Sequence, residues 1–362
     1  YRCNNRCLMC NIWRTPPSLR KEELSLIELQ KLFDQNYWFR VENVLITGGE
    51  PFLRQDLVEI ILYLKKTFPV AGIGLTSTGI STERIINVVK DLDTSTNFIR
   101  KPLGIGISID GYGENHDAIR GIKGGFQKAV NTIKALKEFR GISCLISFTI
   151  MPTNWHDLLG IYELACDLNT GFVFRFAQIS SAFYNNCEMQ FKWQLHDLTK
   201  IKEFTSKILT KKESGFLTRI RDPFRYFVAN MVKYQIEHKR LFNCYSGTHS
   251  FFLDPYGNVR PCVMLDQVFG NIKDRIFEQI WNSNYATKIR TMIKNKKCHC
   301  WTECEACLSL PRNLKVMIES IWRELRLYGC ISPSFENAVT KGCPQSLFRK
   351  DKSCLSRTSK TL

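Results

Sequence analysis

The chain has 362 residues, 44% of them hydrophobic, and a net charge of +17 from 51 Lys and Arg against 34 Asp and Glu. This length suits one large domain and a smaller one, and so apolar a composition builds a core, which excludes disorder throughout. The basic residues are dispersed over amphipathic stretches such as 287–297 and 315–326, so solvated faces are favoured over nucleic-acid binding, while an acidic partner stays open.

Apolar stretches of strand and helix type alternate along the first half of the chain. Strands are predicted over 41–47, 72–78, 103–109, 144–150 and 172–179, and helices over 25–35, 56–68, 83–92, 125–139 and 156–168. Continuous apolar strands separated by helices are typical of a parallel sheet covered by helices. The α/β pattern predicts a barrel or part of one, with its chemistry at the C-terminal ends of the strands.

The second half of the chain reads differently. Residues 192–240 are mainly helical, and a hairpin is predicted in 251–262 because Asp254 to Asn258 supply turn residues. One helix is predicted over 277–293. We expect a core domain at 1–185, a helical linker at 186–243, a small cysteine-rich α+β domain at 244–330 and a disordered tail at 331–362.

Seven of the 15 cysteines lie in two tight groups, at 3–10 and at 298–307, too close together to staple distant parts of a fold. No signal-peptide segment precedes them, and no apolar run reaches the roughly 18 residues of a membrane span. We therefore expect a cytoplasmic, reduced protein without a membrane partner, whose thiolates are available for metal.

The first group, Cys3, Cys7 and Cys10, has the spacing C-x3-C-x2-C. A tetrahedral zinc site requires four ligands, and no His lies in this segment to be the fourth. An iron-sulfur cubane held by three cysteines leaves one iron open to a substrate or cofactor, which suits this run better. A zinc knuckle completed from elsewhere in the chain is the alternative.

Motifs downstream of this run, taken together with it, resemble those of a known family. Residues 48–51 read Gly-Gly-Glu-Pro, Thr78-Gly79 ends the next strand, and 108–111 read Ser-Ile-Asp-Gly before the segment His116 to Gly121. With the cysteine run, these motifs resemble the radical S-adenosylmethionine (SAM) superfamily over residues 1 to about 180. The resemblance implies a partial (β/α)6 TIM-like barrel whose first strand is truncated here.

The resemblance also implies the cofactors and their site. Cys3, Cys7 and Cys10 would bind a 4Fe-4S cluster that cleaves SAM reductively and releases a 5'-deoxyadenosyl radical. Glu50 would pair with the SAM ammonium group. The residues implied to bind SAM are Met9, Gly48, Gly49, Glu50, Pro51, Thr78, Ser108, Asp110 and Arg120. Met9 stands where the family commonly has an aromatic residue, so its packing on adenine is expected to be less specific.

The second group lies downstream of Cys244 and Cys262, which flank the predicted hairpin in the pattern C-x12-G-x4-C. This resembles the auxiliary-cluster extension of the superfamily, called SPASM with two clusters and Twitch with one. The full SPASM spacing is absent, so one auxiliary 4Fe-4S cluster is expected. The implied ligands are Cys244, Cys262, Cys300 and Cys304, with Cys307 nearly as good and Cys298 a weaker substitute. A four-cysteine zinc site is the alternative.

The predicted function is that of a radical SAM enzyme that abstracts a substrate hydrogen, with the auxiliary cluster for electron transfer. Peptide modification is favoured, and dehydrogenation of a sugar or aminocyclitol is the alternative within the superfamily. A low-potential donor such as flavodoxin or ferredoxin is the implied electron partner. A non-enzymatic zinc- or nucleic-acid-binding protein is the alternative from another class.

Overall fold

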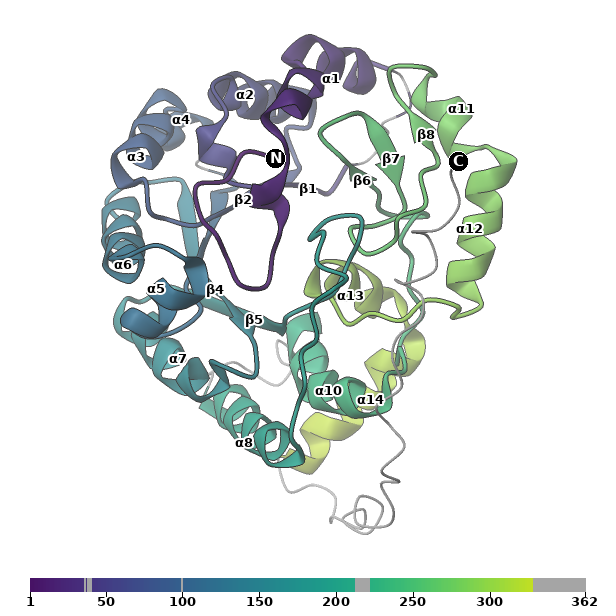
Figure 1. The fold of residues 1–362 in the computed structure, drawn as a ribbon. Helices are drawn as coiled ribbons and strands as arrows, with labels where there is room; N and C mark the ends of the chain where they lie inside the picture. Colours follow the sequence, from purple (N-terminus) through teal and green to yellow (C-terminus); the bar gives the residue numbers. More distant parts are fainter. Residues whose placement is uncertain (36, 38–40, 99, 212–221, 328–362) are drawn as a thin grey trace.

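A curved sheet of five parallel strands lies at the centre of the molecule (Figure 1). The computed structural model describes residues 1–35, 37, 41–98, 100–211 and 222–327. The strands are β1 Asn43–Ile46, β2 Gly72–Ser77, β3 Leu103–Ser108, β4 Ile142–Ile150 and β5 Gly171–Phe176, and each pairs in parallel with the next. Successive βα units are thus neighbours in space, as in a TIM-like barrel built part of the way round.

Helices cover the outer face of this sheet (Figure 1). They are α1 Leu26–Phe33, α2 Leu57–Thr67, α3 Thr82–Asp91, α4 Thr94–Asn97, α5 Glu114–Arg120, α6 Gly125–Leu136, α7 Leu158–Asp167 and α8 Leu195–Lys211. Short 3-10 turns lie at Ile12–Arg14, Pro17–Glu22, Pro51–Leu53, Trp155–Asp157 and Leu310–Arg312. Ser25 and Glu28 form a capping box that begins α1. Buried strand residues such as Ile105 and Ile107 pack against the apolar helix faces and form the main core.

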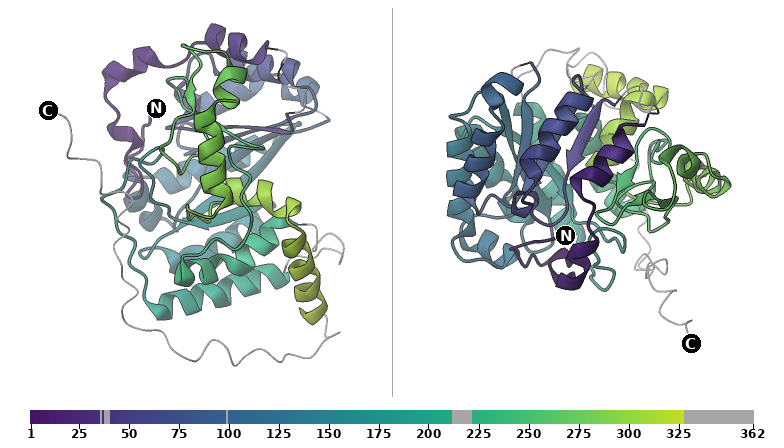
Figure 2. Two further views of the ribbon diagram at one scale, coloured as in Figure 1. Left: turned by 90° about the vertical axis from the view of Figure 1, so that its right-hand side faces the viewer. Right: turned by 90° about the horizontal axis from the view of Figure 1, so that it is seen from above.

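The C-terminal part of the chain fills the side of the molecule that the sheet leaves open (Figures 1 and 2). Its elements are α10 Pro223–Glu237, β6 Phe252–Leu253, β7 Asn258–Arg260, β8 Gly270–Asn271, α11 Phe277–Trp281, α12 Asn284–Lys294, α13 Glu303–Ser309 and α14 Leu314–Leu327. The small antiparallel sheet and α12 share a second core that includes Leu32 of α1. Trp301 and Ala306 belong to the main core instead. The C-terminal part therefore contacts the first helix and the main core.

The sheet and its covering helices confirm the predicted α/β fold class. One predicted helix, 277–293, is wrong in its extent, because the chain breaks it into α11 and α12. Ser283 begins α12 as its N-cap, where its hydroxyl accepts a hydrogen bond from the Ala286 backbone N–H. The predicted hairpin also has a third strand, β8, and α5 was not predicted.

The expected tail at 331–362 lies outside the described residues. Within the described part of the chain, none of the helices combines the length and the apolar character needed to cross a membrane.

Candidate active site

The three cysteines at the N-terminus lie on a loop that backbone hydrogen bonds fix from one side. The backbone N–H groups of Arg6 and Leu8 donate to the carbonyl oxygens of Arg120 (3.0 Å) and Ile119 (2.9 Å), at the C-terminal end of α5. These carbonyls are among those that a helix leaves without an internal partner. The segment 116–121 therefore positions the cysteine loop as well as offering side chains to it.

Two further segments hold the same loop. The backbone N–H of Glu50 donates to the Arg2 carbonyl (2.6 Å), and the backbone N–H of Asn11 donates to the Tyr184 carbonyl (2.8 Å). The Asn186 side chain donates to the Met9 carbonyl (2.8 Å). The loop is thus tied to the ends of β1 and β5, which places its thiols at the C-terminal edge of the sheet.

Two glycines of the motifs make this approach possible. A Cβ added at Gly49 would lie 1.9 Å from the Arg2 carbonyl oxygen. Gly121 has φ of +65° and would place a Cβ 2.9 Å from the Arg6 carbonyl oxygen. Gly49 is among the residues that the family resemblance implies to bind SAM. The structure adds a second requirement for a glycine there, contact with the cysteine loop itself.

The thiols of the loop are largely withdrawn from water. Cys7 is buried, and Cys3 and Cys10 are half-buried. Burial raises the pKa of Cys10 to about 12 and also raises the pKa of Cys3, and the three cysteines lie near enough to influence one another. Such thiols lose their protons when a metal or a positive charge stabilises the thiolate.

Arg120 brings a positive charge to this loop. Its Nη1 donates to the Cys7 sulfur at 3.6 Å, and its Nη2 forms an ion pair with Asp110. Burial opposes the charge, but Asp110 and Cys7 outweigh burial and raise the pKa of Arg120. The guanidinium group thus remains charged beside the thiols.

Asp110 is fixed by groups on three sides. Its Oδ1 accepts from the Thr149 backbone N–H (2.6 Å), and its carbonyl accepts from the Asn154 side chain (2.7 Å). Its backbone N–H donates to Nδ1 of His116 (3.1 Å). These bonds hold the Asp110 carboxylate toward Arg120, so the motif residues 108–121 act as one unit. Asn154 has no motif of its own and was missed by sequence reasoning.

Glu50 is a buried carboxylate that turns toward the end of β2. It accepts hydrogen bonds from the Ser77 hydroxyl (3.0 Å) and from the backbone N–H and hydroxyl of Thr78 (both 2.7 Å). Burial outweighs these donors and raises the pKa of Glu50. Thr78 therefore holds Glu50, and Ser77 joins a site for which only Thr78 was predicted.

The remaining predicted SAM-binding residues lie around the same edge. Met9 is buried against Cys7, Ile119 and Met151. Pro51 begins the 3-10 turn after Glu50, and Ser108 is the last residue of β3. Positive φ at Gly48, +144°, requires a glycine there. The structure thus gathers the predicted residues at one end of the sheet.

The site has buried polar atoms that a bound group could satisfy. Both side-chain polar atoms of Asn5, in the cysteine loop, are buried without a hydrogen-bond partner, and so is Nε of Arg120. Buried polar atoms are normally satisfied, so these atoms fit a site that holds a polar cofactor beside the thiols. Among the described residues, no three Cys, His, Asp or Glu side chains converge on a single metal ion, an arrangement that a cubane does not require because each thiolate binds a different iron.

Four cysteines of the C-terminal part neighbour one another. Cys300 lies near Cys244 and Cys298, and Cys262 lies near Cys300. Burial raises the pKa of Cys262, Cys298 and Cys300, that of Cys300 to about 12. Cys298, the weaker substitute in the sequence prediction, thus lies within this group.

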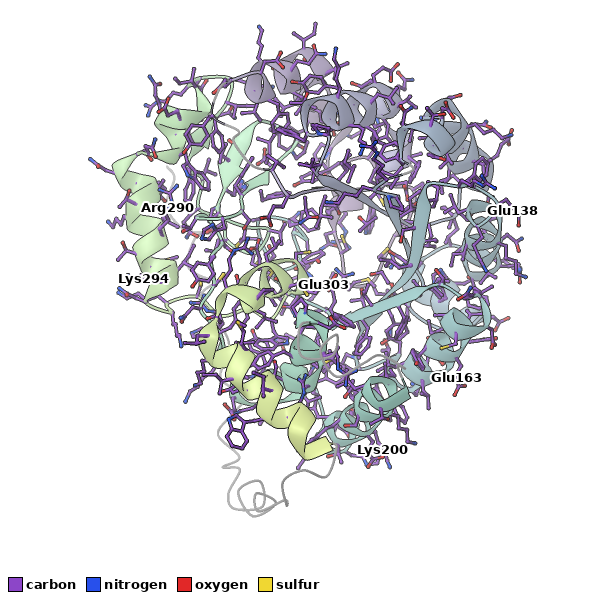
Figure 3. The ribbon with its side chains drawn as sticks, turned by 180° about the vertical axis from the view of Figure 1, so that it is seen from behind. Glu138, Glu163, Lys200, Arg290, Lys294 and Glu303 are labelled. Carbon is purple, nitrogen blue, oxygen red and sulfur yellow. The ribbon has the colours of Figure 1, made fainter. Side chains whose placement is uncertain are left out.

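Cys304 and Cys307 have other neighbours. Both lie near Glu303 and Arg175, and burial raises the pKa of Cys304 to about 12. Arg175 of β5 forms an ion pair with Glu303 of α13 at 2.7 Å and also donates to the Ser147 hydroxyl. Figure 3 shows Glu303 in the middle of the molecule, while Glu138, Glu163 and Lys200 lie at its periphery. Neither Arg175 nor Glu303 was predicted, since no spacing joins residues so far apart.

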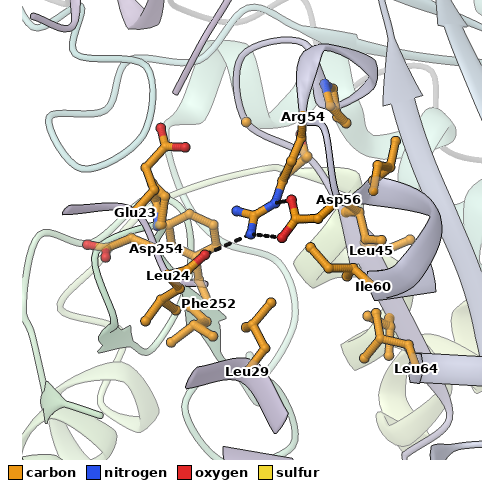
Figure 4. A pocket seen from close by; sticks show the side chains of 18 of the residues that line it. Glu23, Leu24, Leu29, Leu45, Arg54, Asp56, Ile60, Leu64, Phe252 and Asp254 are labelled. Atoms are coloured by element: carbon orange, nitrogen blue, oxygen red, sulfur yellow. Dashed lines mark hydrogen bonds and ion pairs between the residues drawn. The ribbon is translucent and has the colours of Figure 1, made fainter. Parts of the chain in front are cut away.

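A pocket of about 550 Å³ lies along β1, away from Cys7 and Arg120. Within the described residues β1 pairs only with β2, and the pocket extends from β1 to the hairpin residues 251–255. Figure 4 shows Arg54 in its wall, bonded to Asp56 and to the Leu24 carbonyl. The pocket includes Gly48 to Pro51 but none of the three cysteines.

The parallel sheet, the three-cysteine loop at its C-terminal edge and the second cysteine group together match the arrangement expected of a radical SAM protein with an auxiliary-cluster domain. Comparison with known families agrees: a model of the radical SAM superfamily matches residues 1–165, and a model of the iron-sulfur cluster-binding SPASM domain matches residues 244–308. The chain belongs to the radical SAM superfamily, whose cofactors are SAM and iron-sulfur clusters.

Individual proteins are similar at a lower level. The chain is 27% identical over 292 residues to the antilisterial bacteriocin subtilosin biosynthesis protein AlbA of Bacillus subtilis (strain 168), covering 80% of this chain and 59% of AlbA. It is 26% identical over 317 residues to the AdoMet-dependent heme synthase of Oleidesulfovibrio alaskensis, covering 82% of this chain and 77% of that protein. The chain thus spans about three fifths of AlbA.

A solved structure shares the fold. That of native anSMEcpe with bound AdoMet and the Kp18Cys peptide superposes with a TM-score of 0.55 at 15% identity, covering 91% of this chain and 97% of that one.

Proposed function

We propose that this chain cleaves SAM at a cluster on Cys3, Cys7 and Cys10 and abstracts a hydrogen atom from a peptide. The observation that carries this proposal is the position of the cysteine loop at the C-terminal edge of the sheet. Backbone hydrogen bonds join the loop to Glu50 on one side and to Arg120 on the other. When bound, the cluster supplies the electron for reductive cleavage of SAM.

The chain's own residues would orient the cofactor. Arg120 keeps a positive charge beside Cys7 and is held by Asp110. From the family resemblance, Arg120 and Ser108 approach the carboxylate and ribose of SAM, and Glu50 approaches its ammonium group. A carboxylate and a guanidinium at opposite sides of the loop match the opposite charges of an amino acid.

An auxiliary cluster would use Cys244, Cys262 and Cys300. For its fourth ligand, proximity in the structure favours Cys298, whereas the family resemblance favours Cys304 or Cys307. Iron analysis of Cys298→Ala and Cys304→Ala separates these assignments. The substitution that removes a ligand should lower the iron content or change the spectrum of the auxiliary cluster.

A peptide is the favoured substrate because AlbA, a bacteriocin biosynthesis protein, resembles the chain over 80% of its length. The basic net charge also suits an acidic peptide. A flavodoxin or ferredoxin would supply the electron.

Anaerobic reconstitution with iron and sulfide, followed by dithionite and SAM, tests the reaction class. We expect about eight irons per chain from two 4Fe-4S clusters, and release of 5'-deoxyadenosine. Cys7→Ala should abolish that release, whereas Cys166→Ala, which changes an exposed thiol of α7, should not. A fully loaded protein that releases no 5'-deoxyadenosine contradicts the proposal.

The substrate class needs a second comparison. Peptides encoded next to the gene should increase 5'-deoxyadenosine release and change in mass, while a sugar or a tetrapyrrole should do neither. Stimulation by the tetrapyrrole or the sugar alone would overturn the peptide assignment and leave the reaction class intact.

A further inference from the structure

Arg240 is a buried arginine at the edge of the second cysteine group. It is 4% exposed and follows α10 in the chain. Its Nη1 donates to the Cys298 sulfur at 3.1 Å, its Nε to the Phe242 carbonyl at 3.2 Å and its Nη2 to the Ile293 carbonyl at 2.5 Å. The guanidinium group is therefore fixed, with one edge on a sulfur atom.

The charge of Arg240 lacks a carboxylate partner among the described residues, none of whose ion pairs includes it. In this respect it differs from Arg120, which pairs with Asp110, and from Arg175, which pairs with Glu303. Burying a cation without an anion is costly. Arg240 instead donates to the sulfur atom of Cys298 and lies near enough to Cys300 to influence its thiol.

An iron-sulfur cluster would supply this missing negative charge. Four thiolates and the sulfides of a 4Fe-4S cluster carry more negative charge than its irons carry positive charge, and reduction adds one more electron. A cation and a hydrogen bond at a cluster sulfur stabilise the reduced form more than the oxidised form, which raises the reduction potential.

We propose that Arg240 raises the reduction potential of the auxiliary cluster by donating a hydrogen bond to the Cys298 sulfur. The proposal rests on the auxiliary cluster of the proposed function, with Cys298 as its fourth ligand. In this role Arg240 acts through the cluster, as a positioning residue. A higher potential makes the cluster a better acceptor of the single electron left on a substrate radical after hydrogen abstraction.

A structural role for Arg240 competes with this one, because its other two bonds end on backbone carbonyls. Ile293 lies in the last turn of α12, where a basic side chain stabilises the helix end in any case. Arg290, on the same helix, offers a matched control. It donates to the carbonyl oxygens of Gly247 and Trp281 and contacts no sulfur among its described bonds. Figure 3 shows Arg290 on α12, one turn before the helix ends.

The experiment uses the full chain with Cys3, Cys7 and Cys10 replaced by alanine, so that only the auxiliary cluster is present. The midpoint potential is measured by redox titration followed by electron paramagnetic resonance. We expect Arg240→Gln to shift the midpoint to a more negative potential, Arg240→Lys to lie between it and the parent, and Arg290→Gln to leave it unchanged.

Three outcomes overturn the proposal, and they are distinguishable. If the Arg240→Gln protein loads iron and keeps the parent's midpoint potential, the proposed role of Arg240 is wrong and the auxiliary cluster stands. If both Arg240 variants lose iron while Arg290→Gln loads normally, Arg240 is needed for the structure of the cysteine site and not for its potential. Absence of any cluster in the parent removes the auxiliary cluster itself, and with it this part of the proposed function.

Discussion

His116 is a buried histidine whose ring accepts a hydrogen bond and leaves its other nitrogen unpartnered. Nδ1 accepts from the Asp110 backbone N–H, and Nε2 has no hydrogen-bond partner. Burial, with the nearby charge of Arg120, lowers the pKa of His116 to about 4. The neutral ring, protonated on Nε2, is therefore the form present in the folded protein at pH 7.

This lowered pKa predicts a loss of stability in mild acid. Between about pH 6.5 and pH 4 the unfolded chain binds a proton at His116 that the folded chain does not, so the free energy of unfolding falls as the pH falls. The loss attributable to this residue is about 3 kcal/mol at pH 4. Urea unfolding of the metal-free chain at several pH values measures it. His116→Gln should flatten the pH dependence in this window, and an unchanged slope would contradict the assignment.

Gly49, in the motif after β1, makes a very close backbone approach to the start of the cysteine loop. A Cβ there would lie 1.9 Å from a backbone oxygen, which only displacement of residues 1–3 can relieve. Gly49→Ala should therefore remove the iron of the first cluster while the auxiliary cluster stays loaded. Gly160→Ala, in α7 with open space around its Cβ, is the matched control and should keep both clusters. Iron per chain and 5'-deoxyadenosine release report the difference, and normal loading of Gly49→Ala would refute the steric reason.

The ion pair between β5 and α13 lies beside Cys304 and Cys307. The Arg175 and Glu303 side chains are each 16% exposed, so their ion pair is largely desolvated. Removing one partner leaves the other charge buried and costs about 3–5 kcal/mol. Glu303→Gln should thus lower the urea midpoint strongly, whereas Glu203→Gln, at a more exposed ion pair with Lys200 on α8, should cost less than about 1 kcal/mol. Equal effects would show that the Arg175–Glu303 pair is not the desolvated link that its burial indicates.

Sequence patterns predicted the helices and strands that form because of the residues within them. The strands at β2 to β5 are apolar runs, and their covering helices have apolar faces, so pattern alone located them. β8 has only two residues, Gly270 and Asn271, and forms because β7 offers it a partner. α5 begins and ends at glycines with polar residues between, a pattern that resembles a loop. The break between α11 and α12 did have a local signal in Ser283, which apolar spacing outweighed.

The proximity of the candidate residues could be predicted from the sequence more fully than their contacts. Spacing alone singled out Cys3, Cys7 and Cys10 as candidate ligands, because three thiols so close in sequence cannot avoid being close in space. That Glu50 bonds to Thr78, or that Arg175 reaches Glu303, depends on how strands and helices meet, and no short motif encodes it. The choice among Cys298, Cys304 and Cys307 depends likewise on where α13 packs.

At the scale of the whole molecule, Trp301 joins the second cysteine group to the main core. Its ring is 1% exposed, stacks between Phe227 and Tyr234 of α10 and donates its Nε1–H to the Phe227 carbonyl at 3.1 Å. Trp301 directly follows Cys300, so the packing of Trp301 in the core also fixes the position of Cys300. Core packing and the auxiliary site are therefore expected to fail together.

Trp301→Ala should cost about 3–5 kcal/mol of unfolding free energy, as a large buried aromatic side chain does. Because the cavity left by the missing ring loosens the backbone at Cys300, the variant should lose auxiliary-cluster iron while the first cluster loads as before. Trp322→Ala, at a residue 51% exposed on α14, is the control and should change neither quantity appreciably. Urea unfolding and iron per chain are measured together. Full auxiliary iron in a strongly destabilised Trp301→Ala protein would show that the cluster site folds independently of the core, contrary to the packing described above.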